Sequence, residues 1–400
     1  MSIRGAKLAR QIPIFRGGCR MKKVKLGEIC EIQAGGTPSR NKKEFWVQGN
    51  IPWVKIKDIN SKYISKVEEH ITELGLQFSS AKLFSRGTIL YTIFATIGEV
   101  AILDIDAATN QAIAGLRLKS EKVLKDYLYF FLLSIKNRVK NDSRGVAQNN
   151  INLTYLKNIE VPIVEKSIQQ EICNNLTKIN QIITLRNQQL IELSNLVKSR
   201  FNEMFEEYPD SVFLDTYIKE LRAGKSLAGE ENNKNKVLKT GAVSYDYFNS
   251  SEVKNLPIDY IPLDEHKVEI GDVIISRMNT SELVGAAGYV WTINSDNIYL
   301  PDRLWKVVLN DRVNPVFLWK LITNEITKLK IKRIASGTSG SMKNISKSKF
   351  LQIRVPLPPL SLQNEFADFV AQVDKSQLAI QKSLEELETL KKSLMQEYFG

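Results

Sequence analysis

The sequence predicts an α+β protein in which two mixed α/β modules alternate with two long helices. Three observations lead to this fold class. The second half of the 400-residue chain repeats part of the first, two stretches of about 40 residues lack proline, and the segments between them are typical of short strands and turns. The length also favours two or three domains over one.

The internal repeat is found by matching Val161-Pro162 to Val355-Pro356, which gives a shift of 194 residues. The register then holds for about 55 residues and places Gln169 on Gln363. A repeat of this length indicates two copies of one structural unit, because a solenoid repeats every 20 to 50 residues or so.

Each proline-free run carries apolar residues at alternating three- and four-residue spacing, which is typical of a coiled-coil seam. The predicted helix-pair interface consists of Ile172, Leu176, Ile179, Ile183, Leu190, Leu193 and Val197 in the first run and Phe366, Val370, Val373, Ile380, Leu384, Leu387 and Leu394 in the second. Each run would form a rod of roughly 60 Å. The alternative is a pair of ordinary long bundle helices.

The modules between the helices contain short stretches rich in β-branched and aromatic residues, such as 88–94 and 304–309, bounded by Gly, Asn or Asp. The two modules resemble each other much less than the helices do. We place the first module at 21–158, its helix at 159–208, the second module at 209–354 and its helix at 355–400.

The formal net charge of +12 suggests a polyanionic partner, but five basic residues in the first 20 positions contribute to it; removing them leaves +7. That charge permits nucleic-acid binding without establishing it. Residues 1–20 could be a targeting segment, a basic DNA-binding arm or an extension upstream of Met21, and we favour the extension, which could be disordered.

Composition excludes several classes of protein. The longest apolar runs fall far short of the roughly 18 residues that cross a bilayer, so no transmembrane helix is predicted. The three cysteines have no paired spacing, which argues against a disulfide framework or a zinc site and fits a reducing cytoplasm.

Motifs for catalysis are also missing. Asp210 and Glu220 only loosely imitate a nuclease carboxylate pattern, and Asn314-Pro315-Val316-Phe317 lacks the second proline of an adenine methyltransferase tetrapeptide. The sequence contains no glycine-rich phosphate loop, and its two histidines lie far apart. We therefore predict no enzyme activity, no catalytic residue and no metal site.

Several segments resemble type I restriction-modification specificity subunits. In the first module these are KLGEICEIQAGGTPSR (25–40), IPWVKIKDI (51–59), GTILYTIFATIGEVAI (87–102) and TNQAIAGL (109–116); in the second they are GDVIISRMNTSELVGAAGYV (271–290) and LPDRLWKV (300–307). The junctions IEVPIVEKSIQQEI (159–172) and IRVPLPPLSLQNEF (353–366) look like the family's entry into its helices. The resemblance covers residues 21–400.

The resemblance implies a pseudo-twofold protein with two target-recognition domains held apart by an antiparallel coiled-coil pair. Each domain would read one half of a bipartite, asymmetric site in double-stranded DNA, and the helices would set the gap. Two methyltransferase subunits and motor-nuclease restriction subunits would be the partners. S-adenosylmethionine, ATP and Mg would bind to those partners and not to this chain.

Side chains that can reach base edges or phosphates define the candidate DNA contacts. They are Thr37, Ser39, Arg40, Lys42, Lys43, Lys55, Lys57, Lys62 and Thr92 in the first module and Arg222, Lys225, Ser226, Lys239, Arg277, Asn279, Thr280 and Arg303 in the second. Turn formation, ordinary surface exposure or ion pairing remain alternatives for each. Two alternative functions stay open as well: a coiled-coil DNA-binding regulator, or the specificity subunit of a related restriction system that is not type I.

Overall fold

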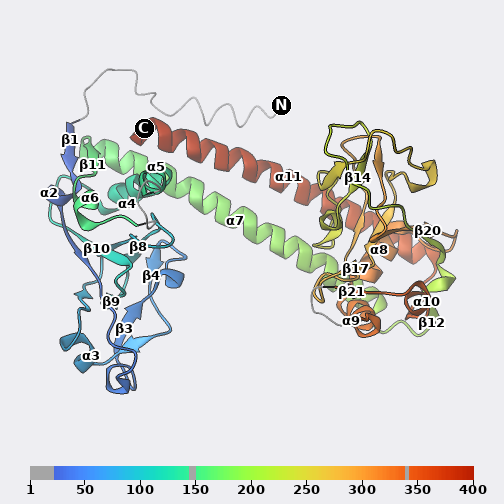
Figure 1. Cartoon of the computed structure of the whole chain (residues 1–400), viewed down its shortest axis with the longest axis horizontal. Coiled ribbons are helices and arrows are strands. Elements are labelled where there is room, and N and C mark those ends of the chain that lie inside the picture. Colours follow the sequence, from blue (N-terminus) through green and yellow to red (C-terminus); the bar gives the residue numbers. More distant parts are fainter. Residues whose placement is uncertain (1–21, 144–149, 338–341) are drawn as a thin grey trace. The chain divides into compact units, whose positions relative to one another are not determined.

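The computed structural model describes residues 22–143, 150–337 and 342–400. The predicted extension at 1–20 lies outside these ranges. The chain divides into two compact units, one formed by Met1–Leu185 with Leu384–Gly400 and the other by Arg186–Ser383. Each unit contains one mixed α/β module and a half of each long helix, as predicted for the fold class (Figure 1).

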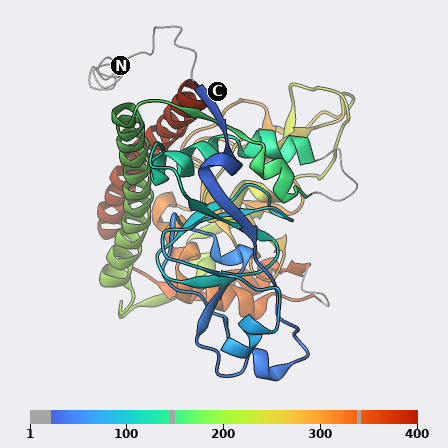
Figure 2. The ribbon, with the colours of Figure 1, turned by 90° about the vertical axis from the view of Figure 1, so that its left-hand side faces the viewer.

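The long helices are α7 (Lys166–Phe205) and α11 (Leu360–Phe399), each of 40 residues. Within each unit they run antiparallel, since the first half of one packs beside the second half of the other. In the first unit Leu176 shares a core with Leu394, and in the second Phe205 shares a core with Phe366. In Figure 2, α7 is green and α11 is red.

The first module is built on a five-stranded sheet in the order β2 (Cys30–Ala34), β10 (Ile113–Leu118), β7 (Ile89–Thr92), β8 (Val100–Leu103) and β4 (Tyr63–Ile64). A second sheet has the order β5 (His70–Ile71), β3 (Ile51–Val54), β9 (Ala107–Thr109) and β6 (Leu83–Phe84). The remaining elements are the pair β1 (Lys22–Lys25) and β11 (Glu160–Ile163), and helices α2 (Leu26–Ile29), α3 (Glu73–Gln77), α4 (Lys125–Ser134), α5 (Lys136–Asp142) and α6 (Leu153–Lys157).

The main sheet of the second module has the order β13 (Ile218–Arg222), β20 (Leu304–Leu309), β16 (Val273–Ser276) and β18 (Ala287–Tyr289). Beside it lie β15 (Val253–Asn255), β14 (Lys236–Leu238) and β19 (Ile298–Tyr299), and the pairs β12 (Ser211–Phe213) with β22 (Arg354–Pro356) and β17 (Met278–Asn279) with β21 (Lys343–Asn344). The helices are α8 (Pro315–Thr323), α9 (Glu325–Ile334) and α10 (Lys347–Leu351).

The two modules share one framework despite their dissimilar sequences. The order β2-β10-β7-β8 in the first module corresponds to β13-β20-β16-β18 in the second, and every neighbour in both series is antiparallel. In each module the strand before the long helix pairs with the module's first strand, β11 with β1 and β22 with β12. The repeat thus includes the modules as well as the helices.

A buried glutamine joins each long helix to its module. Gln169 is fully buried; its carbonyl oxygen accepts a hydrogen bond from the Leu124 N–H (2.8 Å), and its amide nitrogen donates to the carbonyls of Lys122 and Val164 (both 2.8 Å). Gln363 makes the same three bonds in the second unit, to the Asn314 N–H and the carbonyls of Arg312 and Pro358. These bonds satisfy backbone groups at the start of α4 and α8, which would be costly to bury unpaired.

Candidate nucleic-acid interface

In the second module, three loop segments meet at one edge of the main sheet. Strands β13 and β16 are both antiparallel to β20, so their last residues, Arg222 and Ser276, lie at the edge where β20 begins. The Gly224 N–H donates to the Pro301 carbonyl (3.0 Å). The sheet therefore brings the predicted residues 225–226, 277–280 and 303 together.

The first module has the equivalent edge, formed by the ends of β2 and β7 and the start of β10. Here the Gly35 N–H donates to the Ile113 carbonyl (3.0 Å), and the Ile93 N–H donates to the Ala112 carbonyl (2.8 Å). The predicted residues Thr37, Ser39 and Arg40 lie in the loop that follows β2 at this edge.

In both modules a side-chain hydrogen bond joins the loop after β2 or β13 to the segment just before β10 or β20. The Thr37 hydroxyl donates to the Gln111 side-chain oxygen, and the Ser226 hydroxyl donates to Asp302. Gln111 and Asp302 were not among the predicted site residues, because only the sheet brings them to these loops. In each module a glycine precedes the residue that makes this hydrogen bond, and it allows the two backbone segments to approach closely. A Cβ at Gly224 would lie 2.0 Å from the Leu300 carbonyl oxygen.

Arg40 is held by aromatic and acidic neighbours. Its guanidinium lies 3.7 Å from the Trp46 ring centre and donates to Glu69 (2.7 Å). Hydrogen bonds from Lys55 and, to a lesser extent, from Arg40 lower the pKa of Glu69. Arg40 and Lys55 thus share one carboxylate, which limits their freedom to contact DNA in this conformation.

Other predicted cations of the first module also have acidic partners. Lys57 pairs with Glu68, and Lys62 lies 3.0 Å from Asp126. Lys42 and Lys43 form no ion pair with the residues that the structure describes, and both are exposed, as is Ser39.

The prediction for Thr92 is wrong. Its side chain is fully buried, and its hydroxyl donates to the Thr96 carbonyl and accepts from the Glu99 N–H (2.8 Å). Thr92 therefore stabilises the turn between β7 and β8 and does not face solvent.

In the second module the predicted cations fall into two groups. Arg222 pairs with Glu220 (2.6 Å), and Lys239 pairs with Glu252 (3.7 Å). In contrast, Lys225, Arg277 and Arg303 form no ion pair within the described ranges. They are the better placed to meet phosphates or bases.

Arg277 and Asn279 follow β16 at the sheet edge. The Arg277 guanidinium lies 5.9 Å from the Trp305 ring centre, and its Nε is buried without a hydrogen-bond partner. Asn279 is half-buried and donates to the Ser276 hydroxyl (3.3 Å), while Thr280 is exposed. Arg277 is half-buried and forms no ion pair with the described residues, and an arginine without an acidic partner at this edge suits an acceptor such as guanine or phosphate.

The predicted helix-pair residues lie on the less exposed face of α7 and α11. Those nearest the modules are fully or nearly fully buried: Ile172, Leu176, Ile179 and Leu394 in the first unit and Val197, Phe366, Val370 and Val373 in the second. The others are half-buried: Ile183, Leu190, Leu193, Ile380, Leu384 and Leu387. Buried positions are thus concentrated where the helices also contact a module.

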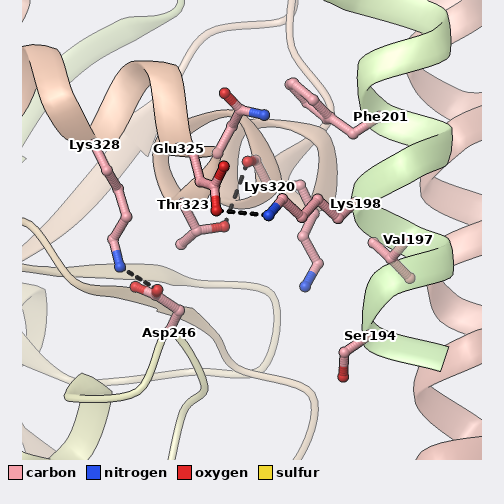
Figure 3. A pocket seen from close by; sticks show the side chains of 10 residues that line it. Ser194, Val197, Lys198, Phe201, Asp246, Lys320, Thr323, Glu325 and Lys328 are labelled. Carbon is pink, nitrogen blue, oxygen red and sulfur yellow. Dashed lines mark hydrogen bonds and ion pairs between the residues drawn. The ribbon is translucent and has the colours of Figure 1, made fainter. Parts of the chain in front are cut away.

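Within the second unit, a pocket of about 330 Å³ lies between α7 and helices α8 and α9 (Figure 3). Lys198 of α7 pairs with Glu325 (2.5 Å), and Lys328 pairs with Asp246. Lys320 also lines the pocket, and burial lowers its pKa to about 8 although Asp374 and Asp246 act in the opposite direction. The first ion pair holds α9 against α7, and the second holds α9 against the loop that contains Asp246.

Metal ligands and thiols were the remaining chemically reactive groups to place among the described residues. No group of three or more His, Cys, Asp or Glu among them is placed to hold a metal ion. Cys30 and Cys173 are buried, and burial raises the pKa of each thiol to about 12, which disfavours a nucleophilic thiolate. No described helix has the length and apolar character to span a membrane.

Two modules on one framework, each continuing into a long helix, define a protein built on an internal structural repeat. The family model for the type I restriction modification DNA specificity domain matches residues 20–195 and 218–390. The chain therefore belongs to the family of type I restriction-modification specificity subunits.

Individual relatives agree with this assignment. The chain is 31% identical over 214 residues to the type I restriction enzyme MjaIX specificity subunit of Methanocaldococcus jannaschii, covering 51% of this chain and 49% of that one. It is 31% identical over 196 residues to the EcoR124I/EcoR124II specificity subunit of Escherichia coli, covering 47% of each. The chain thus matches about half the length of these curated relatives.

Solved structures support the fold. The S subunit of a type I system from M. genitalium has a TM-score of 0.58 at 15% identity, covering 96% of this chain and 98% of that one. A chain from a structure titled as a study of complex assembly in the type I R-M system has a TM-score of 0.60 at 17% identity. The match covers 94% of this chain and 97% of that one.

Proposed function

We propose that this chain is the non-catalytic DNA-reading subunit of a type I restriction-modification complex in the cytoplasm. Each module reads one half of a bipartite site through its sheet edge. The observation that carries the proposal is the duplicated edge itself, where the same three strands present different side chains: 37–43 in the first module and 225–226, 277–280 and 303 in the second. One framework with two sets of side chains suits an asymmetric target.

The long helices supply the surfaces for partner subunits in this proposal. Leu185 of α7 is 64% exposed, and Ile191 and Leu196 of α7 and Leu378 of α11 are also exposed although each is a large apolar residue. Exposed apolar side chains on a helix favour contact with another protein. Methyltransferase subunits would dock here and motor-nuclease subunits would join them, with S-adenosylmethionine, ATP and Mg bound by those partners.

Coexpression with a type I methyltransferase subunit, in a host without adenine methylation, tests the proposal. Sequencing of modified bases should then show methylated adenines in two short sequences separated by a fixed gap. The chain alone and the methyltransferase subunit alone should give none. Methylation by this chain alone would refute its non-catalytic role, and a pair that copurifies but methylates without sequence preference would refute its role in recognition.

A further inference from the structure

A pocket in the second unit is lined by basic side chains and contains no acid. Lys330 and Arg333 come from α9, Lys349 comes from the short helix α10, and Arg354 begins β22; the pocket has a volume of about 370 Å³. The other lining residues are Ile334, Gln352 and Ile353. None of the four cations forms an ion pair with the described residues of the chain.

Two of the four side chains are fixed in place by neutral groups. The Lys330 amine donates to the Arg354 carbonyl (2.8 Å). The Arg354 guanidinium lies 4.9 Å from the Phe213 ring centre and donates to the Ser211 hydroxyl (3.4 Å). Their positive charge is thus oriented but not neutralised, while Arg333 and Lys349 are exposed.

The internal repeat shows that the framework does not require this charge. The shift of 194 residues places α10 on α6 and Arg354 on Glu160. In the first unit Glu160 pairs with Lys23 (3.5 Å), and Tyr155 stands at the position of Lys349. The same elements fold in the first unit with a tyrosine and a carboxylate, so the shared framework does not depend on a cation at these two positions.

The segments that follow α9 and precede α10 pair with each other and with β17 at the sheet edge of the second module. Strand β21, which shortly precedes α10, pairs with β17, and β17 follows Arg277 directly. The segment after α9 joins the same strand, since Ser336 and Asn344 exchange backbone hydrogen bonds of 2.9 and 2.8 Å. The segments on either side of the pocket's helices thus reach the proposed reading edge, while Arg354 lies opposite Phe213, before the start of β13.

We infer that the pocket formed by Lys330, Arg333, Lys349 and Arg354 binds the DNA sugar-phosphate backbone beside the half-site read by the second module. This inference rests on the proposed function. Two guanidinium and two ammonium groups around one acid-free concavity suit a phosphate, which arginine binds through paired donors. Because Tyr155 and Glu160 stand in the first unit at the positions of Lys349 and Arg354, we expect this backbone contact at the second half-site only.

The test compares two double variants with equal loss of charge on the same two helices. Arg333→Ala with Lys349→Ala removes pocket cations, whereas Lys332→Ala with Lys347→Ala removes exposed cations that do not line the pocket. The full chain is titrated with a fluorescent DNA duplex between about 50 and 200 mM salt, with and without the methyltransferase subunits. The pocket variant should bind at least about tenfold more weakly, and its slope of log affinity against log salt should fall by about 2.

Equal affinities and slopes for the two variants would overturn the inference while leaving sequence-specific recognition intact. Loss of methyltransferase binding with unchanged DNA affinity would also overturn it, because the pocket would then bind an acidic protein surface. If the unmodified chain shows no sequence preference, the proposed function fails, but the comparison on any duplex still tests the pocket because phosphate contacts are independent of sequence. Ethylation of single phosphates should interfere with binding on the flank of one half-site only.

Discussion

Lys320 is a lysine of α8 that lies largely buried in the pocket between α7, α8 and α9. Burial lowers its pKa to about 8 from 10.5. Between these pH values the unfolded chain binds more protons than the folded chain, so this lysine makes stability rise as pH increases from about 8 to 10.5. Below pH 8 the lysine is charged in both the folded and the unfolded chain, so burial of its charge lowers the free energy of unfolding by a constant amount.

Lys320→Met should therefore stabilise the protein at pH 7 by about 1–3 kcal/mol, and this advantage should shrink as the pH approaches 10. Urea unfolding of both proteins across this pH range measures it. Lys198→Met removes an ion-paired lysine from the same pocket and serves as the control for the loss of one positive charge. An advantage that does not change with pH would contradict the assignment.

The buried glutamines give a second prediction about single residues. Gln169→Leu removes three hydrogen bonds, from the part-buried Leu124 N–H and to the carbonyls of Lys122 and Val164. We expect a loss of about 2–4 kcal/mol, confined to the first unit. Hydrogen exchange measured by mass spectrometry should show faster exchange in α4 and the start of α7. Gln170→Leu, at an exposed neighbouring position, should leave exchange unchanged.

Among elements, the long helices allow a test of their proposed role in setting the gap between half-sites. Both cross from one unit to the other, α7 after Leu185 and α11 after Ser383. Inserting one heptad at each of these points lengthens both helices by about 10 Å and leaves the packing within each unit unchanged. The recognised gap should grow by about three base pairs.

Binding selection from duplexes with varied gaps checks this prediction. Three base pairs also rotate the second half-site by roughly 100°, so loss of binding at every gap would be compatible with a rigid pair of helices. A heptad inserted in α7 alone should disturb the pairing with α11 and lower helix content. Unchanged affinity for the original gap, with full helix content by circular dichroism, would refute the role of the helices as a ruler.

For the whole molecule, the division into two units predicts independent readers. Each module has its own hydrophobic core, which it shares with its halves of α7 and α11. Replacing residues 21–158 by the first module of a relative with a different target should change one half of the recognised site and preserve the other. Sequencing of modified bases measures both halves at once, and loss of both specificities in a folded chimera would exclude independent reading.

The sequence by itself determined the features that depend on local pattern. A proline-free run with heptad spacing specifies a long helix, because each hydrogen bond of a helix joins residues four apart. The repeat could be found around Gln169 and Gln363 because both glutamines make the same backbone bonds at the start of a long helix. The fold class followed from these two patterns together with the short strand-like segments between the helices.

Only the tertiary structure decided which predicted side chains are available to a ligand. Arg40 and Glu69, or Ser226 and Asp302, meet through pairings between segments far apart in the chain, so no local pattern indicates that they are partners. The burial of Thr92 and the gathering of Lys330 and Arg354 around one pocket depend on the same long-range packing. The common sheet order of the two modules could not be predicted from the sequence either, because strand pairing joins segments that are far apart in the chain. Many different apolar sequences can also fill the same buried positions, so the two modules share a fold without a visible sequence repeat.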